Sequence, residues 1–325
     1  MSELEDSLKL PVLDLNQPHE PSFLPSSSLL KACQEWGFFY VTNHGIPQSL
    51  FTKIREFSDD VFHICSDTKL KLGPSSCLKT YTPRFIASPY FESLRVSGPD
   101  FFASSKASID ELFGQEKPEF SETLQEYGTN MMKLSKSIIE IILKCLGDGY
   151  EKKFSDSEFG NCHGYMRISN YKPPDDVEEN EVEGLGMHTD MSCITVVFQD
   201  ELGGLQMRSK DGKWLNIHPC ENSLVVNIGD LMQAWSNGRL RSSEHRVVLR
   251  RFRNRFSLAF FWCFEDQKVI VAPDEIVGTG NPRIYSPFVC FKYIKFRESN
   301  EVGNFEKIGY TVKDFAGLKI GNPVI

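Results

Sequence analysis

Two histidines and one aspartate are spaced so that they could bind one metal ion. His188 and Asp190 flank a single threonine, and His245 follows after a long gap. In an extended strand, residues two apart point to the same side, so His188 and Asp190 can share a cation. Two histidines and a carboxylate are the ligands that hold non-haem Fe(II) and leave open coordination positions. The same three ligands could instead hold zinc with an activated water, as in a zinc hydrolase.

A second motif, downstream of His245, could bind a carboxylate. Arg255 and Ser257 repeat the two-residue step and would present a guanidinium and a hydroxyl on one face of a strand. Phe261 has the same parity on this segment. It could face a substrate, or it could equally belong to the core.

The order and spacing of these residues resemble a known signature. His188-x-Asp190, then His245, then Arg255-x-Ser257 is similar to the motif of plant-type 2-oxoglutarate- and Fe(II)-dependent dioxygenases, in the branch of gibberellin oxidases and specialised metabolism. The resemblance implies an oxidoreductase that binds Fe(II), 2-oxoglutarate and O2, with ascorbate as the expected reductant. It also implies that succinate and CO2 are released as a small-molecule substrate is oxidised.

Two further segments extend the resemblance over residues 10–315. Residues 36–47 are similar to the family's Gly-Phe-Phe strand and Asn-His-Gly turn, and residues 166–174 to its Asn-Tyr-Tyr-Pro-Pro segment. Tyr171 falls where the family has a tyrosine whose hydroxyl contacts the cosubstrate. Ser169 replaces the usual asparagine and Lys172 replaces the first proline, which are departures from the pattern.

The resemblance assigns a role to each of these side chains. His188, Asp190 and His245 would bind the iron, and the C1 carboxylate and keto oxygen of 2-oxoglutarate would fill two more positions. The far carboxylate needs a buried countercharge, which Arg255 would supply, because an unpaired charge in a dry barrel is costly. Hydrogen bonds to that carboxylate would come from Ser257 and Tyr171.

Several substrates and one non-catalytic function are compatible with this motif. We expect hydroxylation of a gibberellin or a related carboxylated terpenoid first, and an auxin, phenolic or alkaloid as alternatives. A barrel that only captures a hormone is the other alternative, although such a protein would not need the three metal ligands.

The hydrophobic pattern predicts short strands framed by helices. We expect a strand over residues 10–15, helices over 29–36 and 49–66, and a long helix over 118–146 with apolar residues at three- and four-residue spacing. From Tyr165 onward the pattern is typical of strands, including a hairpin with an Asp211-Gly212 turn. This is a mainly β fold: a double-stranded β-helix of the jelly-roll or cupin kind, with α-helices packed on it.

We expect one integrated unit with four regions along the chain. Residues 1–117 would form an N-terminal region with an irregular lid, 118–148 the backing helix, 149–300 the β-core, and 301–325 the C-terminal helix and tail, with the helix itself over 300–316.

Residues 67–117 are poorly patterned and could be a loop over the core or a lid that meets the substrate. Their aromatic side chains would then line the substrate pocket; they are Tyr81, Phe85, Tyr90, Phe91, Phe101 and Phe102. Arg84 and Arg95 could pair with a substrate carboxylate, but a solvated role is favoured. His44 is interpreted as a structural turn residue.

Composition excludes several classes of partner and location. The formal net charge of −8 disfavours nucleic acid and anionic membranes as partners. The acidic N-terminus does not resemble a signal peptide, and no window approaches the roughly 18 apolar residues of a membrane span. Nine cysteines without Cys-x-x-Cys pairs indicate buried free thiols. We expect a cytoplasmic location, and a nuclear one as well through diffusion.

Overall fold

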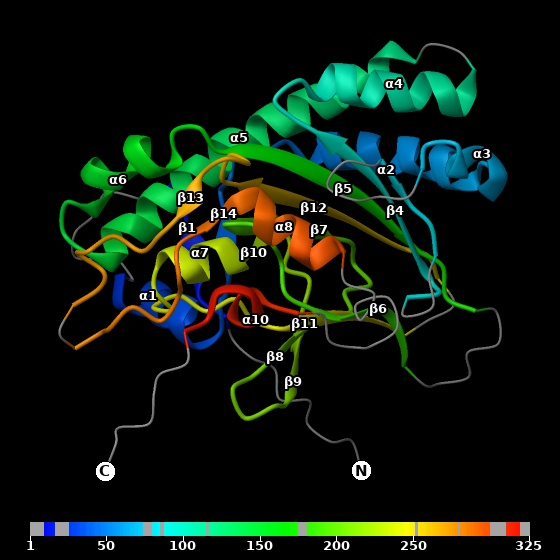
Figure 1. The fold of residues 1–325 in the computed structure, drawn as a ribbon. Coiled ribbons are helices and arrows are strands. Elements are labelled where there is room, and N and C mark those ends of the chain that lie inside the picture. The colour runs from blue at the N-terminus through cyan, green and yellow to red at the C-terminus, as the bar shows by residue number, and fades with distance from the viewer. Residues whose placement is uncertain are drawn as a thin grey trace, which may run out of the picture.

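Two facing β-sheets form the centre of the molecule, and helices cover the outer face of the larger one (Figure 1). The computed structural model describes residues 10–16, 26–73, 80–84, 88–114, 117–174, 181–250, 253–278, 280–299 and 310–318. The larger sheet contains, in spatial order, β1 (Val12–Asp14), β2 (Phe38–Thr42), β10 (Ser223–Ile228), β7 (Ile194–Gln199), β12 (Arg255–Cys263), β5 (His163–Tyr171), β4 (Phe91–Ser97) and β3 (Tyr81–Thr82).

The smaller sheet faces the larger one and has four strands in the described part of the chain. Its spatial order is β6 (Val182–His188), β11 (His245–Leu249), β8 (Leu205–Arg208) and β9 (Trp214–Ile217). The predicted turn at Asp211-Gly212 joins β8 to β9, with Gly212 at φ +86°. A short ribbon of β13 (Val269–Ile270) and β14 (Phe288–Val289) lies beside these sheets. The two facing sheets are the double-stranded β-helix that the sequence predicts.

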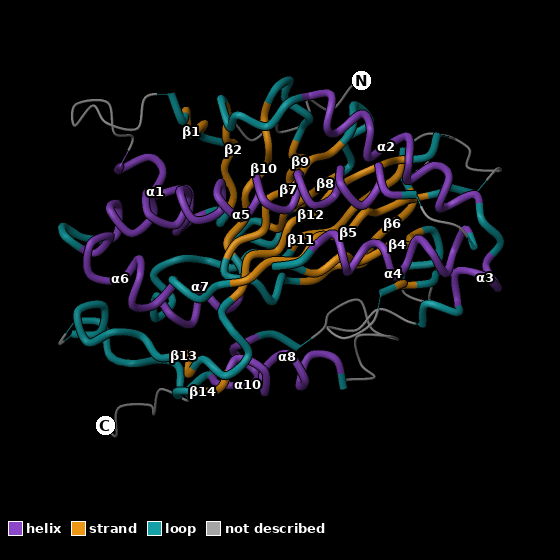
Figure 2. Tube along the Cα trace, turned by 90° about the horizontal axis from the view of Figure 1, so that it is seen from above, coloured by secondary structure: helices purple, strands orange, loops and turns teal. Residues whose placement is uncertain are grey.

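The helices make an outer layer that is seen from above in Figure 2. The helices that precede β5 in the chain are α1 (Ser26–Glu35), α2 (Gln48–His63), α3 (Ser66–Leu70), α4 (Phe101–Phe113), α5 (Pro118–Leu146) and α6 (Tyr150–Phe159). Those that follow β10 are α7 (Asp230–Trp235), α8 (Cys290–Glu298) and α10 (Val312–Ala316). The long predicted helix is α5, which contacts β5, β7 and β12 and so supports the strands that carry the site.

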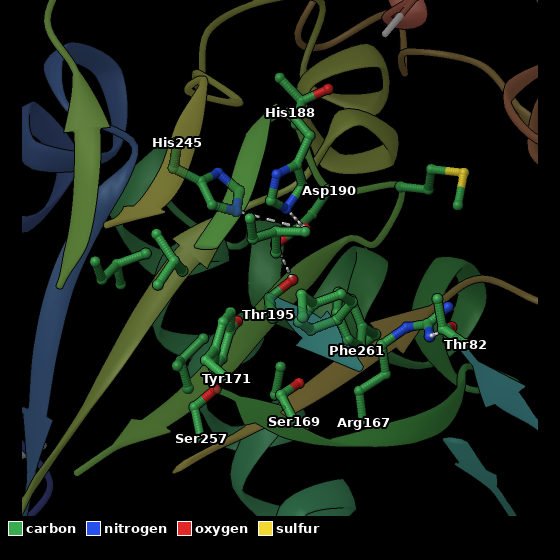
Figure 3. Close-up of a pocket in the computed structure, with 18 of the residues that line it drawn as sticks. Thr82, Arg167, Ser169, Tyr171, His188, Asp190, Thr195, His245, Ser257 and Phe261 are labelled. Carbon is green, nitrogen blue, oxygen red and sulfur yellow. Dashed lines mark hydrogen bonds and ion pairs between the residues drawn. The ribbon is translucent and has the colours of Figure 1, made fainter. Parts of the chain in front are cut away.

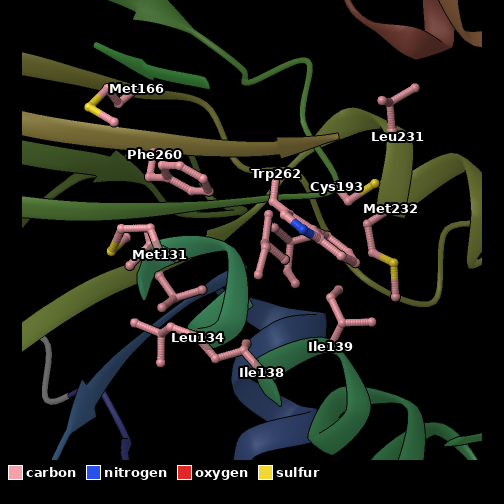
Figure 4. Packing of buried hydrophobic residues seen from close by; sticks show 14 of the residues in the cluster. Met131, Leu134, Ile138, Ile139, Met166, Cys193, Leu231, Met232, Phe260 and Trp262 are labelled. Atoms are coloured by element: carbon pink, nitrogen blue, oxygen red, sulfur yellow. The ribbon is translucent and has the colours of Figure 1, made fainter. Parts of the chain in front are cut away.

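The main hydrophobic core lies between α5 and the larger sheet (Figure 4). Met131, Leu134 and Ile138 of α5 are almost fully buried and point toward Phe260 and Trp262 of β12. Burying side chains of this size stabilises a fold by roughly 1.5–3 kcal/mol each. Because strand side chains alternate, the opposite face of β12 is left to face the smaller sheet.

The segment 67–117 is more regular than the sequence predicts. Its described residues include α3, β3, β4 and α4, so the prediction that the stretch is irregular is wrong. Asp100 caps α4 by accepting a hydrogen bond from the backbone N–H of Ala103 at 2.8 Å, and Gly114 ends that helix at φ +63°. These two residues are the ordinary start and stop signals of a helix.

The C-terminal helix is also placed differently from the prediction. Residues 290–298 form α8 and 312–316 form α10, while 300–309 lie outside the described residues. Within the described part of the chain, no helix is long and apolar enough to cross a membrane. Eight cysteines are described and all are free; Cys65 and Cys220 are exposed, so the prediction of buried thiols is wrong for these two.

Candidate active site

The three predicted metal ligands converge on the inner face of the smaller sheet. His188 ends β6, His245 begins β11, and the two are cross-strand partners. Asp190 follows the end of β6 rather than extending it, yet its Oδ1 lies 3.7 Å from His188 Nε2 and 3.6 Å from His245 Nε2 (Figure 3). The three ligand atoms all lie within 4.8 Å of one another, which suits a single small cation.

The backbone orients both imidazole rings toward this point. His188 Nδ1 lies 2.8 Å from the carbonyl oxygen of Gly186, and His245 Nδ1 lies 3.0 Å from that of Ser243. A carbonyl oxygen can only accept, so each Nδ1 carries the hydrogen and donates it. Each Nε2 is therefore left with the lone pair that a metal ligand needs.

The carboxylate of Asp190 is fixed in the same way. Its Oδ2 accepts hydrogen bonds from Thr195 Oγ1 at 2.6 Å and from Asn227 Nδ2 at 2.8 Å. Because Thr195 donates to Asp190, the 2.8 Å contact between the Ser192 and Thr195 hydroxyls has Ser192 as donor. Only Oδ1 remains for a cation, and no sequence motif pointed to these three partners.

The charges at the site match what a metal requires. Burial, together with the neighbouring His245, lowers the pKa of His188 to about 4, so the ring is neutral at physiological pH. Burial alone would raise the pKa of Asp190, but the two histidines and the hydrogen bonds from Thr195 and Asn227 outweigh it. The pKa of Asp190 is therefore lowered, and neutral imidazoles beside an ionised carboxylate are ready to bind Fe(II).

Arg255 lies on the larger sheet with one nitrogen unpaired. Its Nε donates to the carbonyl of Gly203, and its Nη2 donates to Gln199 Oε1 at 3.3 Å. Its Nη1 is buried and has no partner among the described residues. A buried cationic N–H without an acceptor is costly, so this nitrogen fits an anionic ligand such as a carboxylate.

The other two predicted cosubstrate residues lie beside Arg255. Tyr171 is its cross-strand partner on β5, and the Arg255 guanidinium lies 4.7 Å from the centre of the Tyr171 ring. Burial raises the pKa of Tyr171, although Arg255 and hydrogen bonds with Ser257 and Ser169 act in the opposite direction. Ser257 and Ser169 are the next cross-strand pair on the same face of the ladder, so the four side chains form one polar patch.

The metal ligands and this polar patch line one cavity of about 460 Å³ (Figure 3). Its wall also includes Phe261, whose ring stacks on that of Tyr165 with centroids 4.7 Å apart. The sequence left open whether Phe261 faces a substrate or belongs to the core, and the structure places it at the cavity wall. Phe91 lines this cavity too, whereas Phe101 is buried in the core and Phe85 lies outside the described residues.

Sequence reasoning missed Arg167, which also lines the cavity. It lies on β5 opposite Ala259, and its Nη1 donates to Thr82 Oγ1 at 2.9 Å and to Ser93 Oγ at 3.1 Å. Among the described residues no carboxylate lies within ion-pair distance of its guanidinium. Arg167 lies four residues before Tyr171, so the alternation of side chains along β5 places both on one face and could have identified it from the sequence.

The remaining predicted residues lie away from the metal ligands. The N–H of Ile46 donates to His44 Nδ1 at 3.2 Å in a turn, in agreement with its structural interpretation. Arg84 is half-exposed and lies 3.8 Å from the Glu92 carboxylate. Arg95 stacks on the Tyr165 ring at 3.9 Å and is not part of the main cavity wall.

Two family models match the chain. Residues 162–264 match the 2OG-Fe(II) oxygenase superfamily, and residues 10–95 match the N-terminal region described as that of a non-haem dioxygenase in morphine synthesis. The chain belongs to the 2-oxoglutarate- and Fe(II)-dependent oxygenases, and specifically to the plant members of this family. It is therefore an oxidoreductase that depends on Fe(II), 2-oxoglutarate and O2.

Within that family the chain is gibberellin-oxidase-like. It is 54% identical over 327 residues to the Gibberellin 20-oxidase-like protein of Arabidopsis thaliana, covering 96% of this chain and 99% of that protein. It is 34% identical to Gibberellin 20 oxidase 1-A of Triticum aestivum, covering 83% and 74% respectively. Among solved structures, JOX2 in complex with 2OG, Fe and JA aligns with a TM-score of 0.76 and 27% identity, over 90% of this chain and 86% of JOX2. The Arabidopsis thaliana dioxygenase for auxin oxidation 1 aligns with a TM-score of 0.73 and 25% identity, over 85% and 100%.

Proposed function

We propose that this protein hydroxylates a small carboxylated metabolite, and that a gibberellin is the first candidate substrate. The observation that carries the proposal is the cavity itself. A two-histidine, one-aspartate cluster lies on one sheet, and a buried arginine with an unpaired N–H lies on the facing sheet. This arrangement suits a small dicarboxylate that touches both sides.

Each polar side chain has a separate task in this proposal. His188, Asp190 and His245 would hold Fe(II), which with 2-oxoglutarate and O2 supplies the oxidising chemistry and yields succinate and CO2. Arg255 would receive the far carboxylate of 2-oxoglutarate on its unpaired Nη1. The hydroxyls of Ser257 and Tyr171 would donate to the same carboxylate and hold its plane.

The substrate class is inferred from Arg167. Burial lowers the pKa of its guanidinium, which means that the charge is poorly solvated. Its hydrogen-bond partners are neutral hydroxyls, and the carboxylates of Glu298 and Asp190 act on it from beyond ion-pair distance. A carboxylate on the substrate would supply a directly paired countercharge. Phe261 and Tyr165 offer an apolar wall for a hydrocarbon skeleton next to it. The similarity to gibberellin oxidases makes a gibberellin the first candidate.

The experiment combines a substrate panel with three variants. Purified protein with Fe(II), 2-oxoglutarate and ascorbate is incubated with gibberellins, auxins and phenolics, with and without O2, and mass spectrometry follows succinate and each panel member. We expect oxygen-dependent succinate matched by one altered carboxylic acid. His188→Ala and Asp190→Ala should abolish both signals. Arg167→Gln should raise the KM for the altered acid about 10- to 100-fold, the worth of a charged hydrogen bond.

Controls separate the class of reaction from the class of substrate. Arg84→Gln removes a cation outside the cavity and should leave the KM unchanged. Near wild-type succinate in His188→Ala would overturn the oxygenase assignment for this site. A substrate without a carboxylate, or an unchanged KM in Arg167→Gln, would overturn the substrate class and leave the iron chemistry intact. Ligand binding without any succinate would favour the hormone-binding alternative.

A further inference from the structure

Thr189, the residue between two of the metal ligands, is held from two other elements. Its hydroxyl donates to Asp230 Oδ2 at 2.9 Å, and its carbonyl accepts from Arg297 Nη2 at 2.9 Å. The N–H of Asp230 also donates to the carbonyl of Asp190 at 2.8 Å. The backbone of the metal-binding segment is thus fixed by Asp230 and Arg297, which lie on two helices and do not bind the metal themselves.

The groups that hold Thr189 also bind one another. Asp230 Oδ2 accepts from Arg297 Nη1 at 2.8 Å and from the Tyr293 hydroxyl. Arg297 Nη1 donates further to the Tyr293 oxygen at 2.9 Å and lies 3.0 Å from Thr189 Oγ1. One carboxylate oxygen therefore ties three donors together. We call Asp230, Tyr293 and Arg297 the Thr189 clamp.

The clamp is buried, which makes its geometry hard to replace. Asp230 and Tyr293 are fully inaccessible, and the Arg297 side chain is only 11% exposed. Removing one member of a buried ion pair leaves the other charge uncompensated, so each member depends on the others. Water cannot take over these contacts at such a site without opening the core.

The clamp joins elements that are far apart in the chain. Asp230 is the first residue of α7, whereas Tyr293 and Arg297 are one helical turn apart on the same face of α8. Arg297 also lines the main cavity. Hydrogen bonds of Arg297 with Asp230 and Thr189 therefore join α8 directly to the segment from His188 to Asp190.

We propose that Asp230, Tyr293 and Arg297 are positioning residues that hold His188 and Asp190 in the arrangement that binds Fe(II). This inference rests on the proposed metal site. The ligand atoms of His188 and Asp190 come from a segment that leaves its strand after His188, and no strand pairing fixes Thr189 or Asp190. The clamp supplies that restraint. Groups behind metal ligands typically change metal affinity 10- to 100-fold when they are removed.

The test measures Fe(II) affinity without turnover. Anaerobic calorimetric titration of metal-free protein with Fe(II) alone is carried out on the wild type, Tyr293→Phe and Arg297→Lys. We expect the dissociation constant to rise about tenfold in both variants. Tyr293→Phe keeps the side-chain volume and Arg297→Lys keeps the charge. The thermal unfolding midpoints of the metal-free proteins show whether both variants are folded.

Matched controls distinguish positioning from a general loss of packing. Tyr285→Phe removes another buried hydroxyl, which accepts from Gln233 Nε2 at 2.9 Å and does not contact Thr189. Lys295→Gln changes an α8 residue whose ammonium lies over the Phe291 ring. Both controls should bind Fe(II) as the wild type does, even where Tyr285→Phe lowers the unfolding midpoint.

The possible outcomes separate this inference from the function on which it rests. Unchanged Fe(II) affinity in Tyr293→Phe and Arg297→Lys, or an equal loss in Tyr285→Phe, overturns the clamp and leaves the metal site standing. If the wild type does not bind Fe(II), or if His188→Ala binds it as tightly as the wild type, the proposals of the metal site and of the clamp are both overturned.

Discussion

Each metal ligand in this site offers one free atom because its second polar atom is already used. His188 and His245 donate from Nδ1 to backbone carbonyls, and Asp190 accepts two hydrogen bonds on Oδ2. The residue types and their spacing could be predicted from the sequence, since they form a recognisable motif. The partners could not, because Thr195 and Asn227 reach Asp190 only through the pairing of separate strands.

At the residue scale, the neutral state of His188 predicts how stability depends on pH. Its pKa is about 4 in the folded protein, mainly through burial, and 6.5 when unperturbed. Between these values the unfolded chain binds a proton that the folded chain does not. The free energy of unfolding of the metal-free protein should therefore decrease as pH falls from 6.5 to 4. Below that range the contribution of His188 is constant, while Asp190, whose pKa is lowered, continues the decrease.

Urea denaturation at a series of pH values, with a chelator present, measures this dependence. His188→Gln lacks the titrating ring and should give a flatter curve over the same range. His63, which is on the surface side of α2, provides the control, since His63→Gln should keep the wild-type slope. A wild-type curve that is flat from pH 6.5 to 4 would contradict the prediction.

At the element scale, strands with one polar face were the hardest to predict. In β4, Ser93 and Arg95 lie on the same face as Phe91, while Glu92 on the other face forms a buried ion pair with Lys69 at 2.6 Å. Leu94 and Val96 on the Glu92 face are buried in the core, so apolar and polar residues alternate only from Leu94 to Ser97, and Phe91 and Glu92 break the pattern before them. The long helix α5 was predictable because one whole face packs on the sheet.

The loop that precedes β8 positions Arg255, and a glycine makes that loop possible. Gly204 has φ +92°, and a Cβ there would lie 2.2 Å from the carbonyl oxygen of Val248. Its neighbour Gly203 provides the carbonyl that accepts from Arg255 Nε. Gly204→Ala should therefore displace this carbonyl and raise the KM for 2-oxoglutarate about tenfold, besides costing roughly 1–3 kcal/mol of stability.

Gly212→Ala is the matched control for this effect. Gly212 also has a positive φ, +86°, but a Cβ there would meet nothing closer than 3.7 Å and is remote from Arg255. Gly212→Ala should lower stability through the positive φ alone, without a backbone clash, and leave the KM for 2-oxoglutarate unchanged. If both alanine variants raised that KM equally, the effect would come from lost stability and not from Arg255.

At the scale of the whole molecule, each of the two sheets carries a different part of the site. Two of the metal ligands lie on strands of the smaller sheet and the third lies just after one of them, whereas Arg255, Ser257 and Tyr171 lie on the larger sheet. The larger sheet is supported by α5, and none of the described helices packs on the smaller sheet as extensively as α5 packs on the larger one. A ligand that touches both faces would join the two sheets.

This division predicts that Fe(II) and 2-oxoglutarate stabilise the protein cooperatively. 2-Oxoglutarate has a carboxylate at each end, so it can reach the metal with one and Arg255 with the other. At 100 times its dissociation constant, a ligand that binds only the folded state adds about 2.7 kcal/mol to the free energy of unfolding.

In anaerobic thermal unfolding we expect the unfolding midpoint to rise slightly with Fe(II), hardly at all with 2-oxoglutarate alone, and most with both. His188→Ala should lose all of these shifts, while Arg255→Gln should keep the Fe(II) shift and lose the further rise with 2-oxoglutarate. A full 2-oxoglutarate shift in His188→Ala would show that the cosubstrate is held by the larger sheet alone, and the two sheets would then not be joined through the metal.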